Sequence, residues 1–335
     1  MKILYAIQGT GNGHLARAQE IVPQLKKFGS LDLFVSGAQA DISLPFPVKY
    51  KSKGLSFYFG KSGGINFIKT WKKNSPHDVV NEIKTFPVEQ YDLIINDFEP
   101  ISAWAAKKKD IPIIGLSHQS SFLSRKTPRP KIVDPFSEWI FHSYAPVKKY
   151  VGFHFKEYDK NIFTPVIRPA IREASPVNKG HYTVYLPAYD DEKLVKLLGK
   201  FNNIKWEIFS KHCTKAYTVD NIKVCPVSDQ AFRESMISSA GVLCGAGFET
   251  PAEAIYLQKK LMVIPMKHQY EQQCNAVALK KMGVDQVKKL KKKSLKKIEK
   301  WLDSDYAPDF IFPDIASRAV EFAMEKFEYA NSNIF

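Results

Sequence analysis

A glycine-rich segment near the start of the chain ends in a histidine that can act as a base. Residues 9–14 read Gly-Thr-Gly-Asn-Gly-His and follow a short apolar run at residues 2–7. Glycines permit a tight turn, and a helix that starts here offers free N–H groups to anions. A neutral imidazole in the first turn can take a proton from an attacking hydroxyl. We therefore take His14 as the candidate base; a histidine that only hydrogen-bonds the loop is the alternative.

The spacing of these glycines differs from that of a dinucleotide-binding loop. Gly9, Gly11 and Gly13 alternate, whereas the dinucleotide pattern is G-x-G-x-x-G. The second predicted strand also lacks the terminal acid that would hold a ribose. The pattern argues against NAD, and we expect no cofactor.

A second glycine-containing segment suits a diphosphate. Residues 245–254 read G-A-G-F-E-T-P-A-E-A, with Pro251 at an early position of a predicted helix. The positive end of a helix favours a diphosphate whose charge grows as it leaves. Glu253, one turn into this helix, can hold two vicinal ribose hydroxyls. A surface acid that only favours the helix dipole is the alternative.

A third polar cluster begins the next predicted helix. Residues 264–276 read I-P-M-K-H-Q-Y-E-Q-Q-C-N-A, so a strand ends at Pro265 and acid and amide side chains follow. Such side chains donate and accept hydrogen bonds with sugar hydroxyls, although a polar helix start is the commoner explanation. None of the three segments contains a D-x-D motif. We therefore expect no metal to hold a diphosphate.

Two series of predicted strands and helices position these segments. The predicted strands are 2–7, 31–36, 91–96 and 111–116 in the first series, and 181–186, 206–209, 241–244 and 261–264 in the second. The alternation of strands with helices predicts two doubly wound α/β domains that face each other across a cleft. We expect Rossmann-like domains at 1–165 and 181–312, a proline-containing linker at 166–180, and a C-terminal helix at 313–335 that packs on the first domain.

Charge and composition limit the partners and the compartment. The 335 residues include 49 basic and 34 acidic residues, a net charge of +15. No apolar run approaches the roughly 18 residues of a membrane span, the start does not resemble a signal peptide, and the four cysteines form no metal or disulfide pattern. We expect a cytoplasmic protein.

Two segments concentrate basic residues and point to an anionic membrane surface. Gly54–Lys73 mixes aromatic rings with glycines and lysines, and Lys280–Lys300 holds ten lysines against two acids. Aromatic rings between lysines are typical of an interfacial loop. A peripheral position on the inner face of the membrane follows; a solvated surface without a partner is the alternative. Because no base-reading module is present, nucleic acid is not expected.

The three polar segments together resemble those of the GT-B glycosyltransferases. Their closest similarity is to family 28, which contains the bacterial lipid II-forming N-acetylglucosaminyltransferase and the galactolipid synthases. A bacterial and archaeal branch with a G-x-G-x-G-H loop looks closer still. The resemblance implies a GT-B fold and metal-free, inverting transfer from a nucleotide-sugar, with UDP favoured. It also implies a hydroxyl acceptor that is lipid-linked or belongs to the cell envelope.

The resemblance also implies roles for particular residues, with His14 as the base. On the donor side it implies Gly245, Ala246, Gly247, Phe248, Thr250, Glu253, Glu271 and Gln272. On the acceptor side it implies Gly11, Asn12, Gly13, His118 and Gln119, because L-S-H-Q-S at 116–120 is similar to the H-E-Q-N loop of the lipid II enzyme. The loop at 186–191 lacks the glycines and serines usual in the family, which leaves the nucleotide base open.

Two other functions remain as alternatives at this point. A non-hydrolysing 2-epimerase shares the two-domain architecture, but its G-T-R-P-E and H-P-x-T-R-P stretches are absent. A non-catalytic GT-B-like binding protein would not need His14, Glu253 and Gln272 together.

Overall fold

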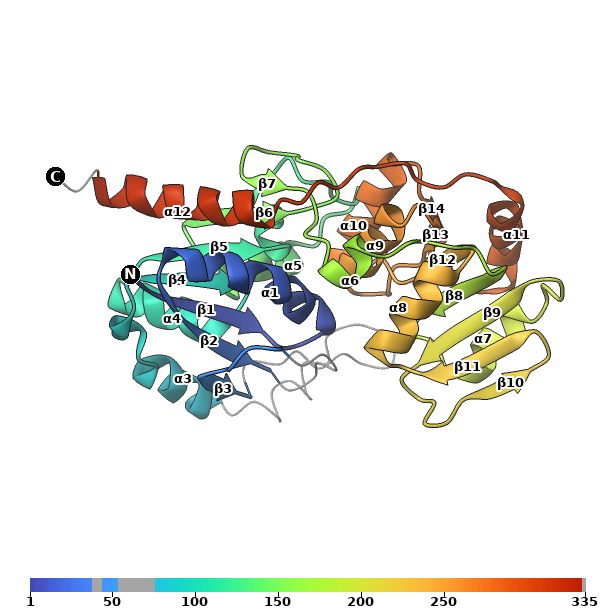
Figure 1. The fold of residues 1–335 in the computed structure, drawn as a ribbon, viewed down its shortest axis with the longest axis horizontal. Helices are drawn as coiled ribbons and strands as arrows, with labels where there is room; N and C mark the ends of the chain where they lie inside the picture. The colour runs from blue at the N-terminus through green and yellow to red at the C-terminus, as the bar shows by residue number, and fades with distance from the viewer. Residues whose placement is uncertain (38–43, 54–75, 333–335) are drawn as a thin grey trace.

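The computed structural model describes residues 1–37, 44–53 and 76–332. It contains two seven-stranded sheets, one in each half of the chain, with helices packed on both (Figure 1). The segment Gly54–Lys73, for which we expect membrane contact, lies outside the described residues.

The first half forms an all-parallel sheet in the order β3-β2-β1-β4-β5-β6-β7. Its strands are β1 (Lys2–Gln8), β2 (Ser30–Ser36), β3 (Tyr50–Ser52), β4 (Leu93–Asp97), β5 (Ile113–Ser117), β6 (Lys149–Phe153) and β7 (Ile162–Phe163). Its helices are α1 (Asn12–Leu25), α3 (Pro76–Thr85), α4 (Pro100–Lys109) and α5 (Pro135–Ser143), with 3-10 turns η1 (Lys26–Phe28), η2 (Val88–Gln90) and η3 (Gln119–Leu123). Apolar runs such as Ile3–Ile7 are fully buried, as expected for a parallel strand covered on both faces.

The second half repeats this plan with the order β10-β11-β9-β8-β12-β13-β14, parallel except for the β10–β11 pair. Its strands are β8 (His181–Tyr185), β9 (Lys205–Ser210), β10 (Tyr217–Val219), β11 (Ile222–Pro226), β12 (Gly241–Cys244), β13 (Lys260–Val263) and β14 (Asp285–Gln286). Its helices are α7 (Asp191–Leu198), α8 (Asp229–Ser238), α9 (Glu249–Tyr256), α10 (Tyr270–Lys281) and α11 (Leu295–Asp303), with the turn η4 (Lys292–Ser294).

The chain crosses between the two halves twice. The first crossing contains a one-turn helix, α6 (Pro169–Arg172), within the segment expected to be a plain linker. The last helix, α12 (Ala316–Ser332), returns to the first half and packs against α1 and β6 (Figure 1). Ala319, Val320 and Ala323 of α12 are fully buried there.

The lysine-rich segment does not form a single helix face. Its ten lysines are all exposed, and they are spread over the end of α10, the turn η4, helix α11 and the loops between them. Among the described helices, none combines the length and the apolar character that a bilayer crossing requires.

Candidate active site

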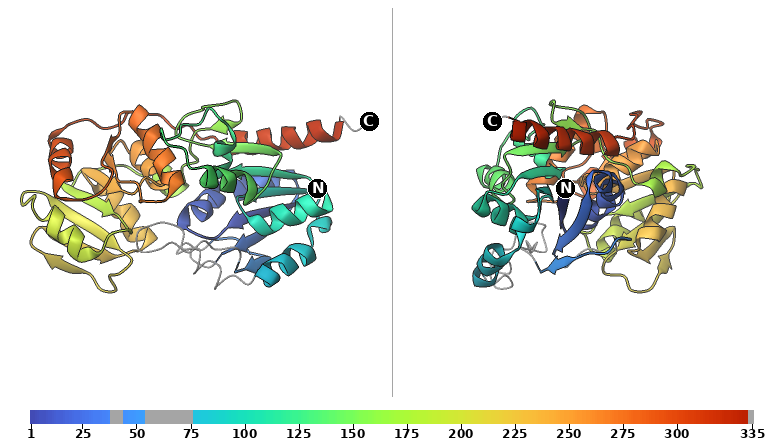
Figure 2. Two further views of the ribbon diagram at one scale, coloured as in Figure 1. Left: turned by 180° about the vertical axis from the view of Figure 1, so that it is seen from behind. Right: turned by 60° about the vertical axis from the view of Figure 1, so that its left-hand side comes forward.

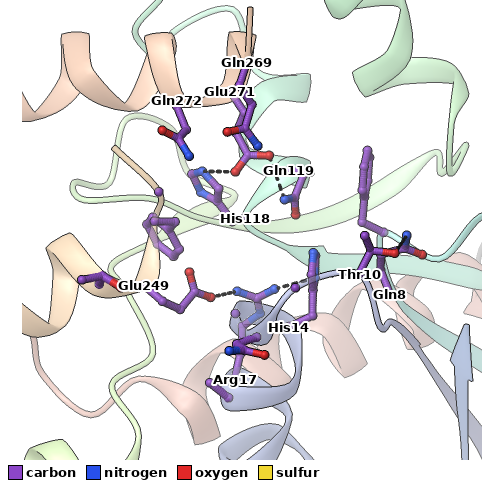
Figure 3. A pocket seen from close by; sticks show the side chains of 18 of the residues that line it. Gln8, Thr10, His14, Arg17, His118, Gln119, Glu249, Gln269, Glu271 and Gln272 are labelled. Atoms are coloured by element: carbon purple, nitrogen blue, oxygen red, sulfur yellow. Dashed lines mark hydrogen bonds and ion pairs between the residues drawn. The ribbon is translucent and has the colours of Figure 1, made fainter. Parts of the chain in front are cut away.

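A cavity of about 450 Å³ lies between the two halves and is lined by both. The first half contributes the start of α1, the start of η3 and one face of α5, whereas the second half contributes the starts of α8, α9 and α10. Figure 3 shows polar side chains from α1, η3, α9 and α10 converging on this space. In open α/β folds the carboxyl ends of parallel strands form the ligand site, and these elements follow such ends.

His14 enters this cavity already bound to a carboxylate. Its Nδ1 lies 2.7 Å from Oδ1 of Asp97, the last residue of β4. Since Asp97 occupies Nδ1, the other ring nitrogen, Nε2, is the one that can accept a proton in the cavity. An acid that fixes the orientation of a histidine and stabilises its cationic form is the arrangement that a general base requires.

Asp97 is buried, and it stays ionised because the guanidinium of Arg17 compensates its charge. Arg17, one turn after His14 in α1, reaches both oxygens of Asp97 at 2.8 and 2.9 Å through its Nη2. Burial alone would raise the pKa of Asp97, but Arg17 and His14 hold it below its ordinary value. The carboxylate therefore carries a full negative charge beside the imidazole.

The same guanidinium crosses the cleft. Nη1 of Arg17 donates to Oε1 of Glu249 at 2.6 Å, and Glu249 is the first residue of α9 in the other half (Figure 3). Burial raises the pKa of Glu249, although Arg17 opposes that shift. A Cβ on Gly13 would come within 3.0 Å of the Glu249 side chain, so the glycine leaves room for this bridge.

His118 lines the cavity and also joins the two halves. Its ring is 1% exposed, with Nδ1 2.8 Å from the Phe153 carbonyl oxygen and Nε2 3.0 Å from the Asn275 side-chain oxygen. The ring also stacks on Phe248 with a centroid distance of 3.9 Å. Both ring nitrogens already face protein oxygens, and the expected contact of His118 with an acceptor stays a prediction.

Two of the expected donor ligands already have protein partners. Both carboxylate oxygens of Glu253 accept from Arg168, at 2.6 and 3.1 Å, and Arg168 also binds Asp229 at 2.6 Å. Gln119 donates to Glu271 at 3.0 Å across the cleft. The carboxylates of Glu253 and Glu271 are therefore paired with Arg168 and Gln119 in the protein itself.

Of the other residues expected to bind the donor, some line the cavity and some do not. Gly247, Phe248 and Thr250 line the cavity around the start of α9, and Gln272 lines it from α10. The Gln272 side-chain oxygen accepts from the Met266 backbone N–H at 2.9 Å. Gly245 and Ala246 are absent from the lining, and Ala246 is fully buried.

The glycine loop on the opposite side reaches the cavity as expected. Gly11, Asn12 and Gly13 all line it, with Asn12 as the first residue of α1. Gly11 has φ = 105°, in a region that favours glycine, so the turn into α1 depends on this residue type.

Sequence reasoning missed the charged partners of the expected residues. These are Arg17, Asp97, Arg168, Asp229 and Glu249. Asp97 could have been predicted from the sequence, because a polar residue at the carboxyl end of an apolar parallel strand lies at the edge of the sheet where ligands bind. The pairing of Arg17 with Glu249 could not have been predicted in this way, because it joins residues 232 positions apart in the sequence.

A family model described as glycosyl transferase family 1 matches residues 1–304. The chain belongs to this family. It is a glycosyltransferase with the GT-B fold, as the resemblance implied. No curated protein matches the sequence.

Solved structures share the fold of this glycosyltransferase at low identity. A UDP-glucosyltransferase from Polygonum tinctorium is 13% identical with a TM-score of 0.58, and 99% of this chain and 94% of that chain are covered. UGT2 of Phytolacca americana, complexed with UDP-2fluoro-glucose and pterostilbene, is 14% identical with a TM-score of 0.57, covering 97% and 93%. MurG of Acinetobacter baumannii is 12% identical with a TM-score of 0.54, covering 99% of both chains.

The glycosyltransferase should lose stability in mild acid through two buried histidines. Burial lowers the pKa of His118 to about 4, and it lowers the pKa of His154, whose ring centroid is 5.1 Å away, well below the ordinary value. Unfolded histidines take up protons near pH 6.5, so the free energy of unfolding should fall as the pH drops below that value. The slope is up to about 1.4 kcal/mol per pH unit for each histidine.

Urea unfolding at several pH values between neutral and mildly acid would measure this slope. His154→Phe keeps a ring in the aromatic cluster and should make the slope shallower, whereas His77→Phe, at an exposed histidine of α3, should leave it unchanged. Identical slopes for parent and His154→Phe would show that His154 is not kept neutral by burial.

Proposed function

We propose that this glycosyltransferase moves a sugar from a nucleotide-sugar to an acceptor hydroxyl in one inverting displacement. The observation that carries the proposal is the hydrogen-bonded pair of His14, in the first turn of α1, and Asp97, at the end of β4. This pair faces the start of α9 across the cavity. A base on one side and a helix N-terminus on the other match the two charges that develop in such a reaction.

The bond changes follow from this placement. Nε2 of His14 takes the proton as the acceptor oxygen attacks the anomeric carbon, and Asp97 stabilises the resulting imidazolium. The bond from that carbon to the diphosphate breaks, and the nucleoside diphosphate leaves with the electron pair on the opposite face. A single displacement inverts the anomeric configuration.

The donor half of the cavity is lined by groups that suit a nucleotide. Tyr185 is the last residue of β8, and Lys211 and Ser228 follow β9 and β11, where a base and ribose have room above the sheet. We favour UDP, because similar folds act on UDP-glucose or hold UDP-2fluoro-glucose. Glu253 is proposed to contact the ribose while it remains paired with Arg168.

Charge compensation for the leaving group is proposed to come from the protein alone. The N–H groups at the start of α9 carry partial positive charge, and Arg17, Arg168 and Lys211 also line the cavity.

We propose a lipid-linked or cell-envelope acceptor, and a protein attached to the inner membrane surface, because the chain carries a net charge of +15.

Replacing the base should slow turnover while sparing donor binding. General-base assistance contributes about 10²–10⁴-fold, so His14→Ala should lower kcat by that factor with little change in donor affinity. Steady-state turnover of a donor found by nucleotide-sugar screening measures it. His77→Ala, at the exposed histidine of α3, is the matched control. Near-parental kcat for His14→Ala would show that another group accepts the proton.

Replacing the proposed ribose ligand should weaken nucleotide binding. Glu253→Ala removes a hydrogen bond to a charged group and should cost about 1 to 3 kcal/mol of binding free energy. Calorimetry with UDP, GDP and dTDP measures this, with Glu234→Ala on the exposed side of α8 as the control. Since Glu253→Ala also unpairs Arg168, thermal stability is measured alongside. Unchanged affinity in a folded variant would return Glu253 to a purely structural role.

Chelation should leave the reaction intact. Because the α9 N-terminus and the lining cations supply the positive charge, both nucleotide binding and turnover should persist in EDTA. The measurement compares initial rates with and without EDTA. Activity that disappears and then returns with magnesium or manganese would contradict the metal-free mechanism.

A further inference from the structure

The two terminal nitrogens of Arg17 bind different carboxylates. Nε and Nη2 donate to Asp97 at 2.8–3.1 Å, and Asp97 is fully buried. Nη1 takes no part in that pair; it crosses the cleft to Glu249 (Figure 3). Nη1 is therefore the nitrogen of Arg17 that can change its partner without disturbing the acid behind His14.

Glu249 is held by fewer contacts than Asp97. Asp97 is bonded to Arg17, to His14 and to the Tyr5 hydroxyl. Within the described part of the chain, Arg17 supplies the only side-chain hydrogen bond to the Glu249 carboxylate, and that side chain is 22% exposed. An anion that competes for Arg17 would therefore displace Glu249 and leave Asp97 in place.

The Glu249 carboxylate lies where the proposed function puts the diphosphate. Glu249 is the first residue of α9, whose N–H groups are proposed to face the leaving group. Its carboxyl carbon would be 3.0 Å from a Cβ on Gly13, in the glycine loop on the other side of the cavity. The left view of Figure 2 shows α1, in blue, at this junction of the two halves. A carboxylate between α9 and the glycine loop repels a diphosphate brought to the same place.

A guanidinium is suited to the exchange of one anion for the other. It binds phosphate and carboxylate oxygens through the same N–H groups. A phosphate oxygen on Nη1 would keep the charge of Arg17 compensated when the bond to Glu249 breaks. Because the Glu249 side chain is partly exposed, it can turn to solvent while α9 stays in place.

We propose that the donor diphosphate displaces Glu249 from Nη1 of Arg17, so that Arg17 becomes a ligand of the leaving group. The proposal rests on the proposed function in one respect, the position of the diphosphate at the start of α9. One guanidinium then contacts both the leaving group and the acid that supports His14. A nucleoside without phosphates leaves the bond between Arg17 and Glu249 intact.

The test is calorimetric titration of the full chain with uridine, UMP, UDP and inorganic pyrophosphate. Glu249→Gln keeps the size of the side chain and removes its charge, which weakens the competitor for Nη1. UDP and pyrophosphate should bind this variant about fivefold or more tightly than the parent, UMP should gain less, and uridine should not change. Glu321→Gln, at an exposed acid of α12, changes the net charge equally and should bind every probe as the parent does.

A second variant tests whether the gain acts through Arg17. Lysine keeps a positive charge beside Asp97 but lacks the second N–H group that reaches across the cleft. Arg17→Lys should therefore bind UDP and pyrophosphate about tenfold or more weakly, with uridine unchanged. Adding Glu249→Gln to Arg17→Lys should then give little further gain. Thermal melts show which variants are folded; if Arg17→Lys is not, the Glu249→Gln titrations decide alone.

The outcomes separate this proposal from the reaction. If the parent binds UDP but Glu249→Gln gains no affinity for UDP and pyrophosphate, the displacement is overturned while the donor site stands. An equal gain for uridine, or an undiminished gain in Arg17→Lys, would also overturn it. A structure with UDP in which Nη1 still binds Glu249 would do the same. If the parent binds neither nucleoside diphosphates nor pyrophosphate, the proposed use of a nucleotide-sugar fails, and the displacement fails with it.

Discussion

The guanidinium of Arg17 joins the charged groups of the cleft into one network. It compensates the charge of Asp97 in the first half and binds Glu249 in the second; Arg17 and Asp97 are buried, and the Glu249 side chain is 22% exposed. Buried ions are costly without partners, so neither carboxylate is easily replaced while the guanidinium remains. A single side chain therefore connects the partner of His14 to the first residue of α9.

Uncharged contacts around this network fix the distance between the halves. His118 of the first half stacks on Phe248 of the second, and Phe155 packs beside the same ring with centroids 5.1 Å apart. Aromatic stacking tolerates small sliding, whereas the Arg17–Glu249 bond does not. The junction thus combines a non-directional apolar contact with a directional ionic one.

The repeating α/β plan was predictable, because buried parallel strands leave continuous apolar runs in the sequence. Runs such as 2–7 and 241–244 became β1 and β12. Short edge strands such as β3, β7 and β14 were missed, since two or three residues carry no periodicity. In the site, the glycine-rich loop before α1 predicted that His14 reaches the cavity. Arg17–Glu249 was not, because ion pairing between distant segments leaves no local pattern.

The return of α12 to the first half makes that domain discontinuous in sequence. Residues 316–332 complete a layer on β6 and α1, yet they leave the ribosome only after the whole second sheet has been synthesised. Until then Leu15, Ala18 and Val22 of the first core lack part of their cover. The two domains therefore cannot mature strictly in order, and a nascent chain would carry an unfinished apolar surface that chaperones recognise.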